Sequence, residues 1–115
     1  MMLLIYIFFL HWVGDFLFQT QWMATNKSHN FTALMTHVLT YTLTLTLGTL
    51  MNFNLKFLLI NFLAHGLTDF LTSKVTSKLW QRHDMHNFFM VVGFDQFIHA
   101  ATLILTVETI LDKGY

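Results

Sequence analysis

"HWVGDF", residues 11–16, places a histidine and an aspartate four positions apart inside a segment that is otherwise typical of a membrane helix. The nine residues before it, "MLLIYIFFL", are all apolar or aromatic. The same spacing recurs in "LAHGLTDF" (63–70) and, in reverse order, in "FDQFIHA" (94–100). A single such pair would carry little information, but three in one short chain need a physical explanation.

The composition of the chain predicts a membrane protein. Hydrophobic residues make up 55% of the 115 positions and charged residues 10%, whereas a soluble domain has about 25% charged residues. We therefore interpret residues 1–115 as a single integral membrane domain, with the lipid bilayer as its main partner. The net charge of zero argues against a nucleic-acid partner, and the absence of cysteine excludes disulfides and thiolate sites.

Apolar runs separated by polar breaks predict four helices, at about residues 3–22, 31–51, 55–80 and 87–111. Each is near the length of about 20 residues that a helix needs to cross the hydrocarbon core. The alternating "TYTLTLTLGTL" (40–50) would suggest a strand in water, but a lone strand in lipid leaves its backbone unpaired. Short connections then predict an all-α fold, an up-down bundle of four transmembrane helices.

Basic residues are divided unequally between the two ends of this predicted bundle. The first and third connections hold four of them and the opposite side holds two: Lys27, Lys74, Lys78 and Arg82 against Lys56 and Lys113. The excess favours a cytoplasmic position for the first and third connections, with both termini outside. The expected location is the bacterial inner membrane, or the host membrane if a phage encodes the chain.

The histidines and aspartates of the helices fall at one depth. With a rise of about 1.5 Å per residue, seven ionisable side chains from four helices lie roughly 7–16 Å from the side of the first and third connections. These are His11, Asp15, His37, His65, Asp69, Asp95 and His99. Positions four apart share a helix face, so each His/Asp pair points in one direction. Gln19 continues the face of the first pair.

Carboxylates at this depth need partners, because a charge at the centre of a bilayer costs roughly 2.5–3.5 kcal/mol on insertion scales. Lys and Arg are absent from the predicted helix cores, so the sequence predicts no salt bridge for Asp15, Asp69 or Asp95. Protonation, pairing with histidine or a bound cation remain. Three carboxylates and four imidazoles form a ligand set suited to one or two Zn, Mn or Fe ions. A metal-free polar network and a haem held by histidines are the open alternatives.

Lys74, Lys78 and Arg82 recur every four residues and form a basic stripe. The simpler interpretation is a helix end at the membrane surface, whose basic side chains reach lipid phosphates. The alternative is that the stripe, together with Gln19, binds the head group of an anionic substrate. Phenylalanine-rich faces could meet lipid or a second copy of the chain in a homo-oligomer, and they include Phe57, Phe62, Phe88 and Phe89.

Three longer stretches carry a family resemblance: "HWVGDFLFQTQWMATNKS" (11–28), "LAHGLTDFLTSKVTSKLW" (63–80) and "GFDQFIHA" (93–100). They resemble a small bacterial and phage membrane-protein family of unknown function, domain of unknown function 3307, over nearly the whole chain. The elements GDFxxQ and DQxxH are specific to it. The motif residues that this resemblance carries over are His11, Asp15, Gln19, His37, His65, Asp69, Asp95 and His99. The chain is also distantly similar to predicted membrane-bound metal-dependent hydrolases.

The second resemblance implies a membrane-embedded, metal-dependent hydrolase of a lipid-linked phosphoester or similar amphiphile. Asp15, Asp69 and Asp95 are then the candidate catalytic acids and bases. One alternative is transport of metal ions or protons, which needs polar residues continuing toward the far side of the membrane. Others are a haem-binding electron-transfer protein, which leaves the aspartates unexplained, and a structural phage membrane modulator, which predicts no metal.

Overall fold

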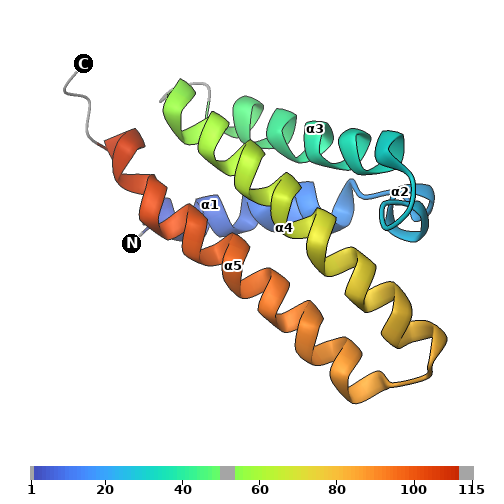
Figure 1. Ribbon diagram of the computed structural model, residues 1–115. Coiled ribbons are helices and arrows are strands. Elements are labelled where there is room, and N and C mark those ends of the chain that lie inside the picture. Colours follow the sequence, from blue (N-terminus) through green and yellow to red (C-terminus); the bar gives the residue numbers. More distant parts are fainter. Residues whose placement is uncertain (1, 50–53, 112–115) are drawn as a thin grey trace.

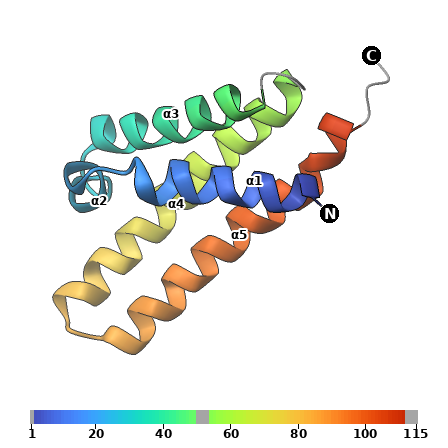
Figure 2. The same cartoon turned by 180° about the vertical axis from the view of Figure 1, so that it is seen from behind.

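The computed structural model describes residues 2–49 and 54–111, with side chains described as far as Glu108, and this part of the chain is helical with no strand. The elements are α1 (Met2–Trp12), the π-helical turn η1 (Val13–Leu17), α2 (Gln21–Asn26), α3 (Phe31–Gly48), α4 (Leu55–Gln81) and α5 (Met85–Leu111). Figures 1 and 2 show the successive long helices α1, α3, α4 and α5 running in alternating directions. The all-α prediction is confirmed.

The first helix ends earlier than the sequence predicts. The N–H of Phe18 bonds to the carbonyl of Val13 at 2.9 Å, which closes the π-helical turn and ends the helix. Thr20 then begins α2, because its hydroxyl accepts a hydrogen bond from the N–H of Met23 at 3.2 Å. The predicted helix over 3–22 is therefore wrong beyond Leu17. The aromatic residues Phe18 and Trp22 made the apolar run look continuous in the sequence, but the cap at Thr20 begins a separate helix.

Asparagine side chains begin the next two long helices. Asn30 accepts hydrogen bonds from the N–H groups of Thr32 and Ala33, and Asn54 accepts one from the N–H of Phe57. Both satisfy backbone donors that have no partner inside the helix. The helix α3 ends at Gly48; the predicted end at Met51 lies outside the described residues.

A tight turn joins α4 to α5. The N–H of Asp84 bonds to the carbonyl of Leu79 and that of His83 to the carbonyl of Trp80, both at 3.0 Å, and His83 has a φ of 57°. This is a Schellman motif, with histidine where glycine is usual. The carboxyl of Asp84 accepts from the side-chain and backbone N–H groups of Asn87, which hold the pKa of Asp84 below its ordinary value.

The helix α4 buries polar groups and exposes leucines. Its buried face carries Phe57, Asn61, His65, Asp69 and Ser73. Its opposite face carries Leu55, Leu59, Leu63, Leu67 and Leu71, which are each 51–65% exposed. This arrangement is the reverse of a helix at the surface of a soluble protein.

Two described helices, α4 and the segment Met85–Glu108 of α5, are long and apolar enough to cross a membrane. Met2–Leu17 is a shorter apolar helix. The helix α3, rich in threonine, is not among these candidates although the sequence predicts four spans. The threonine hydroxyls bond back to carbonyls four residues earlier, as Thr40 does to Thr36 and Thr44 does to Thr40.

An apolar cluster fills one end of the bundle. It contains Ile7, Leu10, Tyr41, Leu45, Phe57, Leu58, Leu103 and Val107. These residues come from α1, α3, α4 and α5, and Figure 1 shows that the start of α1 and the end of α5 lie at this end. The polar residues predicted as ligands lie farther along the same helices, toward α2.

Candidate metal centre

The helices bring all seven predicted ligands into one buried cluster, which we call the His/Asp cluster. His11, Asp15, His37, His65, Asp69, Asp95 and His99 are each at most 9% exposed. The π-helical turn supplies Asp15, and Gly14 beside it lets η1 approach α3 closely. A Cβ atom on Gly14 would lie 3.1 Å from the Tyr41 ring and 3.2 Å from Cβ of Thr44.

Four of these side chains form a first group: Asp15, His37, His65 and Asp69. Nε2 of His37 lies 3.0 Å from Oδ1 of Asp15, from Oδ2 of Asp69 and from Nε2 of His65. Nε2 of His65 lies 3.4 Å from each of the same two carboxylate oxygens. Ligands about 2.0–2.1 Å from a tetrahedral zinc ion stand about 3.3–3.4 Å apart. The His65 distances match this spacing and the His37 distances are about 0.3 Å shorter, so the group could hold a four-coordinate ion.

Hydrogen bonds alone satisfy this group poorly. A neutral imidazole carries one N–H, yet Nε2 of His37 has three close polar neighbours. A cation among the four atoms would satisfy every one of them. The Nδ1 atoms of His37 and His65 are buried with no hydrogen-bond partner. In this respect the site departs from most metal sites, in which the second ring nitrogen of a ligating histidine is held by an acceptor.

Asp15, Asp95 and His99 form a second group. Nε2 of His99 lies 3.1 Å from Oδ2 of Asp95 and 3.0 Å from Oδ1 of Asp69. Asp15 belongs to both groups, and the two oxygens of Asp69 face different histidines. The buried His/Asp groups could thus hold one metal ion, or two bridged by carboxylates, and their nitrogen and oxygen donors suit Zn, Mn or Fe alike.

His11, a predicted ligand, lies outside both groups. Its Nε2 is 2.8 Å from Oε1 of Gln96, which can only accept, so Nε2 carries the proton. Its Nδ1 then accepts from the hydroxyl of Tyr41 at 3.0 Å. The amide of Gln96 in turn donates to Oδ2 of Asp15 and Oδ2 of Asp95, both at 3.1 Å. His11 therefore positions the carboxylates through Gln96.

Tyr41 is a site residue that the sequence reasoning missed. Its ring stacks on that of His65 at 4.0 Å between centroids, and His65 stacks on His99 at 4.1 Å. The column joins α3, α4 and α5 and fixes the orientation of two predicted ligands. The only sequence signal was its place one helical turn after His37, since "HVLTY" (37–41) puts both side chains on one face.

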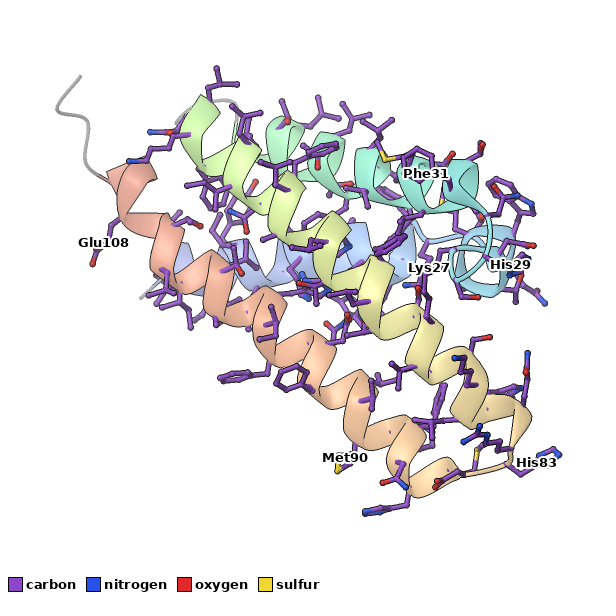
Figure 3. All side chains as sticks on the ribbon, in the orientation of Figure 1. Lys27, His29, Phe31, His83, Met90 and Glu108 are labelled. Carbon is purple, nitrogen blue, oxygen red and sulfur yellow. The ribbon has the colours of Figure 1, made fainter. Side chains whose placement is uncertain are left out.

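Lys27 overturns the prediction that the aspartates have no salt bridge. Its Nζ lies 3.1 Å from Oδ2 of Asp69 and 3.0 Å from Oε1 of Gln19. The lysine belongs to the connection between α2 and α3, and Figure 3 shows it beside α4. Although the helix cores themselves hold no Lys or Arg, a long side chain from a connection reaches inward to the buried carboxylate.

A cleft of about 440 Å³ opens beside the His/Asp cluster, between the α2 side of the molecule and the α4–α5 hairpin. Its lining comprises Asp15, Phe16, Gln19, Ala24, Thr25, Lys27, Ser28, Thr72, Ser73, Thr76, Ser77, Trp80, Phe88, Val92, Asp95 and Gln96. The hydroxyl of Thr72, also missed from the sequence, donates to Oδ1 of Asp95 at 2.6 Å.

The basic stripe does not contribute to this lining. Lys74, Lys78 and Arg82 are exposed, and none is among the lining residues described. Nζ of Lys74 donates to the carbonyl of Ser28 at 2.9 Å and lies 4.7 Å from the centre of the Phe70 ring. The predicted substrate-binding role of the stripe therefore has no support in the cleft, whereas Gln19 does line it.

Comparison with known proteins adds a family and no function. The model of the family described as "Protein of unknown function (DUF3307)" matches residues 3–114. No curated protein and no solved structure matches the chain.

Proposed function

The chain belongs to the DUF3307 family, whose function is unknown, and we propose that it is a membrane-embedded, metal-dependent hydrolase of a lipid-linked phosphoester or a similar amphiphile. One observation carries the proposal. A buried group of carboxylates and imidazoles, spaced as metal ligands are, borders a cleft with an apolar wall.

The case for four membrane-spanning helices rests on what the helices expose. Leucines occupy every fourth position on the outer face of α4, and Leu39, Leu43 and Leu47 do the same on α3, at 54–61% exposed. Soluble monomers rarely expose continuous apolar faces of this length. Lipid is the solvent that makes such faces favourable and that requires the polar groups to face inward.

The first group is proposed to hold the ion through Asp15, His37, His65 and Asp69, and the second through Asp15, Asp95 and His99. A divalent ion bound there would polarise a phosphoryl oxygen and make water a nucleophile near neutral pH. As ligands, the carboxylates of Asp15 and Asp69 would offset the positive charge of the ion.

Asp95 is proposed as the general base, because its carboxylate remains unliganded when a single ion occupies the first group. It lines the cleft, and its carboxylate is held by three donors, the hydroxyl of Thr72, the amide of Gln96 and the ring of His99. These contacts orient its oxygens while leaving the side chain 13% exposed. A carboxylate in this position can accept a proton from a water molecule in the cleft.

The residues between the His/Asp cluster and the opposite end of the bundle favour hydrolysis over transport. A transport path would need polar groups continuing to the other end of the bundle. There the buried pair Asn61 and Thr106, joined by a 2.9 Å hydrogen bond, gives way to the apolar cluster of Ile7, Phe57 and Leu103. A site open on one side suits an enzyme.

The proposal is tested by metal analysis of the protein purified in detergent after growth with Zn, Mn and Fe. We expect about one or two ions per chain, strong depletion in His65→Ala, and full retention in His29→Ala, an exposed histidine that serves as control. Asp95→Ala should abolish phosphate release from lipid phosphoesters. An unchanged metal content in His65→Ala, or unchanged turnover in Asp95→Ala, would refute the metal site or the role of the base, respectively.

A further inference from the structure

The cleft beside the cluster has a single cation among its described lining residues, Lys27. The side chain is 18% exposed, lines the cleft and contacts the buried carboxylate of Asp69. An ammonium group has three N–H donors. Asp69 and Gln19 accept two of them, at 3.1 and 3.0 Å. One donor is therefore available to a molecule in the cleft.

The rest of the lining is suited to a ligand with a polar and an apolar part. Four residues of α4 contribute hydroxyl groups to the lining. They form two pairs whose members lie one helical turn apart, Thr72 with Thr76 and Ser73 with Ser77. The hydroxyl of Ser73 is buried and has no hydrogen-bond partner.

Apolar side chains complete the cleft. Phe16, Trp80, Phe88 and Val92 supply them, three from the α4–α5 hairpin and one from η1. The rings of Trp80 and Phe88 lie 5.2 Å apart between centroids and form one continuous aromatic surface. Apolar surface of this kind favours burial of an alkyl or isoprenoid segment next to the polar group.

We propose that Lys27 binds the phosphoryl oxyanion of the substrate, while the apolar segment next to the phosphate packs against Trp80 and Phe88. This deepens the proposed function and rests on it, because Asp15 and Asp95 in the lining would repel an anion without a bound divalent cation. Lysine binds phosphate as a point charge through charge-assisted hydrogen bonds. Its contact with Gln19, a motif residue in the same lining, holds the ammonium in place.

Tryptophan fluorescence can test this, since Trp80 lines the cleft and the chain has only two others, Trp12 and Trp22. In a W12F/W22F background loaded with Zn²⁺, inorganic phosphate and hexyl phosphate are titrated separately. Lys27→Gln is compared with Lys78→Gln, which removes the same charge from an exposed position outside the lining. Lys27→Arg keeps the charge.

We expect Lys27→Gln to raise the Kd for both phosphates roughly 10- to 100-fold, the range for losing a hydrogen bond to a charged group. Lys78→Gln should change it less than about twofold, and Lys27→Arg should keep most of the affinity. Hexyl phosphate should bind more tightly than inorganic phosphate, because its alkyl chain packs against Trp80 and Phe88. Equal binding would contradict this packing and would identify a soluble phosphate compound as the source of the anion.

Equal effects of Lys27→Gln and Lys78→Gln would overturn the proposal, and so would loss of bound zinc together with phosphate in Lys27→Gln. Zinc is measured separately in every variant. A parent protein that binds no zinc refutes the proposed function, whereas zinc binding without a selective effect of Lys27 refutes only the anion site.

Discussion

Gly14→Ala should loosen the proposed metal centre by pushing η1 away from α3. The added Cβ would lie 3.1–3.3 Å from atoms of Tyr41 and Thr44, including the backbone Cα of Tyr41. Carbon atoms pack best at about 3.5–4.0 Å, so the helices must separate by a few tenths of an ångström. Overpacking of this kind costs about 1–3 kcal/mol, and alanine recovers about 0.5–1 kcal/mol through helix propensity. We expect a net loss of up to about 2.5 kcal/mol.

The matched control is Gly66→Ala, in α4 beside the proposed ligand His65. Its Cβ would meet only Val38, at 3.6 and 3.7 Å, which is ordinary contact. This variant should be as stable as the parent, or more stable by up to about 1 kcal/mol.

Both glycine variants can be compared by unfolding in mixed micelles of dodecyl maltoside and dodecyl sulfate, and zinc affinity by competition with a chromophoric chelator. Because Asp15 follows Gly14 directly and contacts His37 at 3.0 Å, Gly14→Ala should also weaken zinc binding. The reasoning fails if Gly14→Ala is as stable as Gly66→Ala and binds zinc equally well.

Three further substitutions test other parts of the structure. Tyr41→Phe removes the hydroxyl that donates to His11 and should lower the free energy of unfolding by about 1 kcal/mol. The zinc stoichiometry should not change. Loss of zinc would show that the hydroxyl does more than position His11. His83→Gly should raise the free energy of unfolding by about 1 kcal/mol, because the left-handed backbone conformation of His83 is strained for any residue that has a Cβ atom. A destabilised variant would contradict the described turn. Asp69→Asn should weaken zinc binding beyond the roughly 10- to 100-fold loss typical of a residue that only orients a ligand. Asp84→Asn, at a partly exposed helix cap far along the chain from these residues, should leave the affinity unchanged.

The sequence alone was sufficient to predict that the histidines and aspartates meet. Residues four apart share a helix face, so His65 and Asp69 necessarily point the same way, as do Asp95 and His99. In a chain so apolar, the polar face of each helix turns inward. The helical class and the candidate ligands follow from this local periodicity, which requires no knowledge of the packing.

Tertiary structure decided the role of each residue. Nothing in "HWVGDF" (11–16) distinguishes a ligand from a positioning residue, and only the approach of α5 shows that His11 bonds to Gln96. Lys27 and Asp69 are 42 positions apart, and their contact depends on the connection after α2 folding back against α4. Such long-range contacts arise from the packing of whole helices and from capped turns, whereas sequence periodicity reports only on neighbours within one helix.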